Sequence, residues 1–459
     1  MLKELQPDTV FQKLNFALRG VRLAAAITLL IFAFEWRVPY LAGVRMLVSA
    51  GFVGAALVLV AMEIRTLRRK SPSHFMTALS GASLLAAFAA LLTALALEGR
   101  FQWTRYQVLH ADQSRLEKLG RHLIVGYRNL DELRALIERR AIAGVFVSAH
   151  NVDGKDVSVL RGEIDALQAI RRRQGLTPLL IATDQEGGDV SRMSPPLRRQ
   201  PSLGEIVRSN TDAERRRIAV RQFALDMGRD LAGLGFNLNF APVVDLNHRM
   251  FNPNDRYTRI YQRAISDDPQ VVTDVAREYC LALRETGVQC TLKNFPGLGR
   301  VYEDTHLEQA SLSTSVATLE QTDWVPFRAL MRDAGAFTML GHARLLDVDP
   351  QRPVSFSPPV VSGLLRDAWK YEGVLVTDDF SMAAAYASRG GLAAASVSAL
   401  NAGVDLILIA FDPDLYYPAM HALLQAAAEG RLELKALDRS DRRLVGAAGS
   451  NAGQAVTAE

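Results

Sequence analysis

Two residues suited to proton transfer, Asp304 and His306, are separated by one residue in a loop that contains several glycines. The segment that carries them, TLKNFPGLGRVYEDTHLE, begins as an apolar strand at Thr291 and is interrupted at Pro296. Proline and glycine end a strand, and loops that leave strands often carry catalytic groups. A carboxylate can orient an imidazole and stabilise its protonated form, which suits an acid/base near neutral pH. An isolated Asp-x-His is also compatible with a solvated loop, so its meaning depends on the rest of the chain.

Polar side chains also stand at the ends of other predicted strands. Asp184 follows the third apolar segment, Asp245 the fourth, Lys293 and Asn294 end the fifth, His342 follows the sixth and Asp378 ends the seventh. The carboxyl ends of parallel strands in a barrel face one side, so these groups are expected to converge in a single site. Asp245 is explained equally well as a helix cap. Asp184 and Asp378 are better explained as functional groups, because each directly ends an apolar strand with a second acid nearby.

The elements that would position these groups form a regular alternation from about residue 100 onward. The predicted strands span residues 122–127, 144–149, 178–183, 238–242, 289–292, 336–340, 373–376 and 406–410. Helical stretches lie between them, such as 131–140, 158–173, 213–233, 269–286, 318–333, 357–370 and 392–402. This alternation predicts an α/β fold, a (β/α)8 barrel of the TIM type, with a doubly wound open sheet as the alternative. Neither G-x-G-x-x-G after the first strand nor G-x-x-x-x-G-K-[ST] is present, so nothing supports a nucleotide site.

The first hundred residues have a different composition, with apolar runs at 23–34, 46–62 and 76–97. The third run is long enough to span a bilayer, the second is just long enough and the first is short. The basic residues between the second and third runs, Arg65, Arg68, Arg69 and Lys70, predict a cytoplasmic loop. The third run then carries the chain outward. We therefore expect a membrane anchor with about three transmembrane helices at 1–99, a (β/α)8 barrel domain at 100–448 on the outer, periplasmic side of the inner membrane, and a disordered tail at 449–459.

Charge and cysteine content exclude other classes of function. The net charge is +4, which is too small to argue for nucleic-acid binding. The two cysteines, Cys280 and Cys290, lack metal-ligand spacing and fall in a predicted helix and a predicted strand, so two free, buried thiols are expected. No metal site and no cofactor is predicted.

Seven segments, taken together, resemble the family 3 glycoside hydrolases, and among them the bacterial β-N-acetylglucosaminidases of the NagZ type. The segments are IATDQEGGDVSR (181–192), LNFAPVVDLN (238–247), YQRAISDDP (261–269), TLKNFPGLG (291–299), EDTHLE (303–308), MLGHARL (339–345) and YEGVLVTDDFSM (371–382). They occur in the family's order from about residue 119 to 424. The resemblance implies an eight-unit barrel and a retaining mechanism.

Site residues follow from this resemblance position by position. Asp378 matches the nucleophile that forms a covalent glycosyl-enzyme, and His306 with Asp304 matches the acid/base pair. The residues implied to line the sugar pocket are Asp184, Arg263, Lys293, Asn294 and His342. The implied substrate is terminal β-linked N-acetylglucosamine of cell-wall-type glycans or muropeptides, a hypothesis that combines the family with the predicted membrane tether.

The sequence departs from the family pattern at three positions near the site. Asn294 and Leu298 stand where the family has histidines, and Asp189 stands where it has an arginine. These departures leave two alternatives open, a family 3 hydrolase of another sugar such as a β-glucosidase, and a non-catalytic membrane saccharide sensor. Retention of Asp378 together with the Asp304–His306 pair favours an enzyme.

Overall fold

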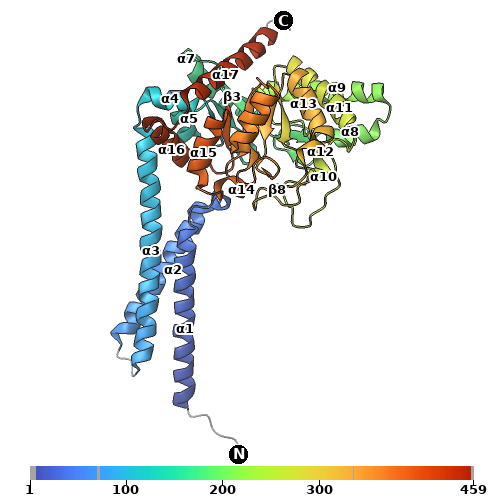
Figure 1. Ribbon diagram of the computed structural model, residues 1–459. Helices are drawn as coiled ribbons and strands as arrows, with labels where there is room; N and C mark the ends of the chain where they lie inside the picture. The colour runs from blue at the N-terminus through green and yellow to red at the C-terminus, as the bar shows by residue number, and fades with distance from the viewer. Residues whose placement is uncertain (1–6, 70–72, 334, 456–459) are drawn as a thin grey trace, which may run out of the picture. The chain divides into compact units, whose positions relative to one another are not determined.

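The computed structural model describes residues 7–69, 73–333 and 335–455. The chain divides into two compact units, Met1–Leu109 and His110–Glu459 (Figure 1). The predicted boundary near residue 99 falls within the helix α3, which continues to Leu109. Each unit is described separately below.

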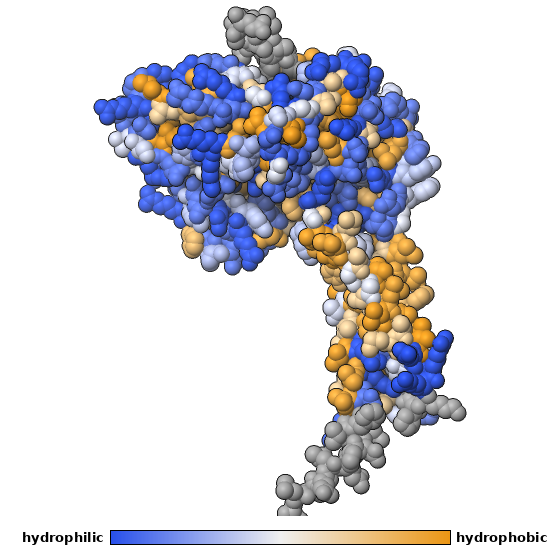
Figure 2. Space-filling view, turned by 180° about the vertical axis from the view of Figure 1, so that it is seen from behind, coloured by the Kyte–Doolittle hydropathy of each residue, from blue (hydrophilic) through white to orange (hydrophobic). Residues whose placement is uncertain are grey.

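The first unit is helical and consists of α1 (Pro7–Phe34), the short 3-10 helix η1 (Pro39–Leu41), α2 (Arg45–Arg68) and α3 (His74–Leu109). Its core combines Trp36 and Phe52 with the small residues Ala33, Ala90 and Ala94, which allow helices to approach closely. The outward-facing residues are largely apolar and appear orange in Figure 2. Three helical stretches, Lys13–Phe34, Arg45–Arg68 and His74–Leu109, are long and apolar enough to cross a membrane.

The second unit is a closed barrel of eight parallel strands, which confirms the predicted (β/α)8 fold. The barrel strands are β1 (Leu123–Val125), β2 (Gly144–Phe146), β3 (Leu180–Thr183), β6 (Leu238–Asn239), β7 (Gln289–Phe295), β9 (Phe337–Leu340), β11 (Leu375–Asp379) and β12 (Leu406–Ile409). They pair in chain order, and β12 closes onto β1. Inward-facing residues such as Phe146, Phe240 and Met339 fill the interior, so the barrel is packed rather than hollow.

Helices surround the barrel strands (Figure 1). The helices are α4 (Gln113–Gly120), α5 (Leu130–Glu138), α6 (Ala149–Val152), α7 (Val157–Arg173), α8 (Leu203–Ser209), α9 (Ala213–Leu234), α10 (Ile260–Arg263), α11 (Pro269–Glu285), α12 (Val316–Gln321), α13 (Trp324–Asp333), the π-helix η3 (Pro359–Ala368), α14 (Ala383–Tyr386), α15 (Gly391–Ala402), α16 (Tyr416–Ala428) and α17 (Leu434–Ala455), with 3-10 turns η2 (Val354–Phe356) and η4 (Pro413–Leu415). Four short strands lie outside the barrel, β4 (Gln185–Gly187) with β5 (Val190–Ser191) and β8 (Ser311–Leu312) with β10 (Arg344–Leu345).

Two further differences from the predicted elements concern a helix and the C-terminal tail. The stretch 318–333 forms two helices, α12 and α13, because the chain breaks at Asp323, whose buried carboxylate binds His248 (2.8 Å) and Arg300 (2.8 Å). The expected tail at 449–459 begins inside α17, which continues to Ala455, and its last four residues lie outside the described part of the chain.

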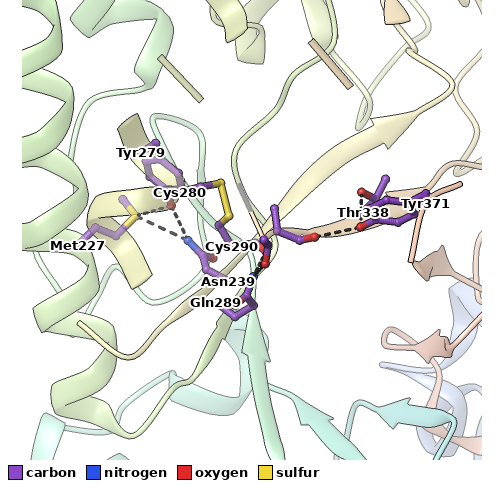
Figure 3. Close-up of a disulfide and its surroundings, with 10 residues drawn as sticks. Met227, Asn239, Tyr279, Cys280, Gln289, Cys290, Thr338 and Tyr371 are labelled. Atoms are coloured by element: carbon purple, nitrogen blue, oxygen red, sulfur yellow. Dashed lines mark hydrogen bonds between the residues drawn. A yellow bond between two sulfur atoms is a disulfide. The ribbon is translucent and has the colours of Figure 1, made fainter. Parts of the chain in front are cut away.

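The prediction of two free thiols is wrong, because Cys280 of α11 and Cys290 of β7 form a disulfide (Figure 3). The predicted helix and strand are correct, but their short connection brings the two buried sulfurs together. Next to the disulfide, Tyr279 accepts a hydrogen bond from the side-chain amide of Asn239 on β6 (3.0 Å). The same amide group pairs with the backbone of Gln185 (2.8 and 2.9 Å), so this buried cluster supports the segment that follows β3.

Candidate active site

The carboxyl ends of β7 and β11 depart from regular strand geometry where they carry candidate site residues. Pairing between β7 and β9 shifts register between Leu292 and Phe295, around Lys293. Pairing between β11 and β12 shifts between Val376 and Asp379, around Asp378. Such irregularities re-aim side chains and are common beside active sites.

Asp304 and His306 form the pair that their spacing predicted. The Nδ1 atom of His306 lies 2.9 Å from Oδ1 of Asp304, and the same oxygen accepts from the backbone amide of His306 at 3.0 Å. A carboxylate can only accept here, so Nδ1 carries the proton and Nε2 is left to exchange a proton with a substrate. Asp304 is buried, whereas the His306 side chain is 37% exposed.

Asp304 is held as an anion by donors on both of its oxygens. Its Oδ2 accepts from the backbone amides of Arg256 (3.0 Å) and Tyr257 (3.1 Å), and Oδ1 also accepts from the hydroxyl of Thr258 (3.1 Å). Burial on its own would raise the pKa of Asp304, but the hydrogen bonds and charge of His306 and the amide donors lower it to about 2. The carboxylate therefore stays charged beside the imidazole throughout the neutral range.

Four charged residues form a second, largely buried cluster, which we call the ion cluster: Asp184 and Glu186 from the segment after β3, Arg263 at the end of α10 and Lys293 of β7. The Nζ atom of Lys293 donates to Asp184 (2.8 Å) and to Glu186 (3.1 Å). Arg263 donates to Glu186 through two nitrogens, at 2.9 and 2.6 Å. The structure thus brings together three residues that the resemblance assigned to the sugar pocket and adds Glu186, which sequence reasoning left out although it lies two residues after Asp184.

Electrostatics keep Glu186 and Lys293 of the ion cluster ionised. Burial would raise the pKa of Glu186, but Arg263 and Lys293 lower it to about 2. Burial would likewise lower the pKa of Lys293, but Asp184 and Glu186 outweigh it and raise that pKa. Charged donors and acceptors fixed in this way suit recognition of sugar hydroxyls.

Asn294 and Leu298, two of the three departures from the family pattern, both donate to the buried carboxylate of Asp245. The side-chain amide of Asn294 donates at 2.8 Å and the backbone amide of Leu298 at 2.8 Å. The helix-cap explanation for Asp245 is therefore wrong, because it holds the loop after β7 instead. A side chain at Gly299 in this loop would place Cβ 1.9 Å from the carbonyl oxygen of Leu246, so only glycine fits. Burial raises the pKa of Asp245 to about 6, despite these donors.

Both ring nitrogens of His342 contact protein groups. Nε2 lies 3.0 Å from the carbonyl oxygen of Asp379, and Nδ1 lies 2.7 Å from the hydroxyl of Ser355. The carbonyl can only accept, so Nε2 carries the proton and Nδ1 accepts from Ser355. His342 is 1% exposed, and burial lowers its pKa, which favours the neutral ring. Its contact with the carbonyl oxygen of Asp379 holds the end of β11.

The two adjacent acids at the end of β11 have different surroundings. Asp379 accepts from the backbone amides of Ala410 (2.8 Å) and Phe411 (2.9 Å), so it fastens β11 to the end of β12. Asp378 is partly exposed, and its Oδ1 accepts from the amide of Asp379 (2.8 Å). Both aspartates are partly exposed, but both carboxylate oxygens of Asp379 are occupied by backbone amides, which leaves Asp378 as the better candidate for a nucleophile.

The carboxylate of Asp378 interacts electrostatically with Lys293 and with His342, and His306 interacts with His342. The third departure, Asp189, lies apart from these buried groups, as an exposed residue paired with Arg199 (2.8 Å). No group of three or more potential metal ligands occurs among the described residues.

Comparisons with known proteins give consistent matches for the barrel unit. The family model "Glycosyl hydrolase family 3 N terminal domain" matches residues 115–447. Beta-hexosaminidase LpqI of Mycobacterium tuberculosis (strain ATCC 25618 / H37Rv) is 33% identical over 344 residues, covering 73% of this chain and 83% of the relative. A beta-hexosaminidase of Stenotrophomonas maltophilia (strain R551-3) is 34% identical over 292 residues, covering 63% and 82%.

A solved structure supports the same relationship. The family 3 β-N-acetylglucosaminidase from Paenibacillus sp. str. FPU-7 matches with a TM-score of 0.67 and 30% identity, over 73% of this chain. The match spans 62% of that protein's length, so less than two thirds of it has a counterpart here.

Proposed function

Because this chain belongs to glycosyl hydrolase family 3, we propose that it is a retaining, exo-acting β-N-acetylhexosaminidase with Asp378 as nucleophile and Asp304–His306 as acid/base pair. The observation that carries this proposal is the imidazole of His306, which is oriented by an ionised Asp304, partly exposed, and fastened through its backbone to the segment that follows Asp378. The relatives named beta-hexosaminidase supply the expected sugar class.

The reaction proceeds in two steps on these side chains. An oxygen of Asp378 attacks the anomeric carbon while His306 gives its Nε2 proton to the departing glycosidic oxygen, which leaves a covalent glycosyl-enzyme. His306, now neutral at Nε2, removes a proton from water, and the resulting hydroxide displaces Asp378 and releases the sugar with its original configuration. Asp304 stabilises the positively charged imidazole in the first step and holds its tautomer in the second.

The ion cluster provides binding contacts for the sugar. Asp184 is the member with the more exposed carboxylate, at 20%, whereas Glu186 is 6% exposed and is occupied by Arg263 and Lys293. We assign hydroxyl recognition to Asp184 and Lys293, and a supporting role to Glu186 and Arg263. We expect this recognition to select a terminal sugar, in keeping with exo action on cell-wall-type glycans or muropeptides.

The location we propose is the inner membrane, with the barrel on the periplasmic side. Three candidate spans and the basic residues at the end of α2 support this orientation. The Cys280–Cys290 disulfide supports it independently, because such bonds persist in oxidising compartments. A membrane-impermeant maleimide should label a Ser158→Cys variant in intact spheroplasts and leave Arg69→Cys unlabelled until the cells are opened. The reverse pattern would refute the orientation.

Activity is tested with paired chromogenic substrates on the full-length protein in detergent. The N-acetyl-β-glucosaminide should be cleaved and the β-glucoside should not, with Asp378→Ala as the inactive control. Cleavage of the glucoside alone would favour a β-glucosidase. Saccharide binding without cleavage of any substrate would favour a sensor.

A further inference from the structure

Thr258 contacts the acid/base pair although nothing in the sequence singled it out. Its hydroxyl donates to Oδ1 of Asp304 at 3.1 Å, the same oxygen that binds the His306 ring, and it lies 3.5 Å from Nδ1 of His306. Thr258 is 5% exposed, so solvent does not supply this donor in its place.

The backbone around Thr258 is held firmly by Asp255. The carboxylate of Asp255 accepts from the amides of Thr258 (2.9 Å) and Arg259 (2.8 Å). Arg259 adopts a φ of 39°, a left-handed conformation that is costly for a residue with a side chain. Two hydrogen bonds thus stabilise a conformation that the chain would not adopt spontaneously, and its result is to aim the Thr258 hydroxyl at Asp304.

The carbonyl oxygen of Thr258 faces the ion cluster. It accepts from Nη1 of Arg263 at 2.7 Å, while the other Arg263 nitrogens bind Glu186. A continuous path of hydrogen bonds therefore runs from Lys293 through Glu186, Arg263 and Thr258 to Asp304 and His306. The groups assigned to the sugar and the groups assigned to the leaving oxygen are joined through this one residue.

We propose that Thr258 is a positioning residue that links the ion cluster to the acid/base pair and fixes Asp304, and through it the His306 ring, in the geometry for proton transfer. The inference rests on the proposed function, because it assigns His306 as the acid. Thr258 contacts neither substrate nor reacting atoms in this role. Its contribution is confined to the step in which His306 transfers its proton to the departing glycosidic oxygen.

Leaving-group dependence tests this assignment. A phenyl N-acetyl-β-glucosaminide needs protonation as it departs, whereas the 2,4-dinitrophenyl glycoside departs as a stable anion. Thr258→Val should lower kcat/KM at least about 10-fold on the phenyl substrate, a part of the roughly 10²–10⁴-fold that a positioned acid supplies. On the dinitrophenyl substrate kcat/KM should stay within about twofold. Thr258→Ser, which keeps the hydroxyl, should restore the phenyl activity.

A matched control is Thr273→Val in α11, where another buried threonine hydroxyl donates to a backbone carbonyl (2.7 Å). It should leave both activities unchanged. Equal losses on both substrates in Thr258→Val, or no loss on the phenyl substrate, would overturn the positioning role while leaving the proposed function intact. A wild-type protein inactive on both glycosides would overturn the proposed function and this inference with it.

Discussion

The carbonyl oxygen of His306 accepts a hydrogen bond from the backbone amide of Ala383 at 3.1 Å. Ala383 begins α14, four residues after the end of β11, the strand that carries Asp378. A second bond, from the amide of Ala384 to the carbonyl of Thr305 (3.3 Å), reinforces the contact. The loop that carries Asp304 and His306 is therefore fastened to the segment that follows Asp378.

The contact between Ala383 and His306 can be removed without changing the side chain of His306 or of Asp378. Ala383 is the first residue of α14, a position that tolerates proline because its amide has no partner within the helix. Ala383→Pro should lower kcat/KM on the phenyl glycoside roughly 2- to 10-fold, the worth of one hydrogen bond, with the melting temperature preserved. Val157→Pro, at the first position of α7, is the control and should leave kcat/KM unchanged. An unchanged kcat/KM in Ala383→Pro would show that the contact is dispensable.

The raised pKa of Asp245 predicts a pH dependence of activity. Because burial raises this pKa to about 6, protonation below that pH removes charge from the acceptor of Asn294 and Leu298. We expect kcat/KM to fall as the pH decreases through about 6 and the step to disappear in Asp245→Asn. An identical step in the variant would assign it to another group.

The contribution of Asp245 to the unfolding free energy is expected to change with pH in the opposite direction from its effect on activity. The folded pKa of Asp245, about 6, exceeds the ordinary value of about 4, so protonation favours the folded state. Its stabilising contribution is full below pH about 4 and is lost as the pH rises through 6. Comparing the unfolding free energies of wild type and Asp245→Asn across this pH range checks whether the contribution of Asp245 decreases as the pH rises.

Glu186 is predicted to stabilise the fold above its unfolded pKa. Its folded pKa is lowered to about 2, so the contribution is present at neutral pH and lost as the pH falls through 2. Glu186→Gln should lower the unfolding free energy at pH 7 by on the order of 3 kcal/mol, because Arg263 and Lys293 lose a buried partner. The deficit should narrow between about pH 4 and pH 2. Glu214→Gln, which breaks an exposed ion pair, is the control and should have little effect on the unfolding free energy. If Glu186→Gln lowered the unfolding free energy by the same amount at every pH, an electrostatic origin of the stabilisation would be contradicted.

The disulfide is expected to stabilise the barrel near the candidate site. It joins residues 10 positions apart, and loss of such a bond costs roughly 2–4 kcal/mol. Cys280→Ser with Cys290→Ser should lower the melting temperature, and alkylation under denaturing conditions should detect no free thiol in the wild type. Two alkylated cysteines in protein purified from the membrane would contradict the bond.

Sequence patterns predicted the eight strands because each is a short apolar run bounded by turn residues. The same patterns placed Asp184, Lys293 and Asp378 at strand ends, where the structure has them. They did not predict Glu186 or Thr258, since the roles of these residues depend on contacts 77 and 46 positions away along the chain. The disulfide was missed because the spacing of two cysteines does not specify how a helix packs on its neighbouring strand.

The central claim, attack by Asp378 with formation of a covalent glycosyl-enzyme, is tested most directly by trapping that species. A 5-fluoro-N-acetylglucosaminyl fluoride should form the adduct rapidly and release it slowly, and the intact mass should increase by one sugar residue. Peptide mapping is predicted to place the sugar on Asp378, with no adduct in Asp378→Ala. An adduct on Asp379 or Glu186, or turnover with no trapped species and an inverted product, would contradict the account.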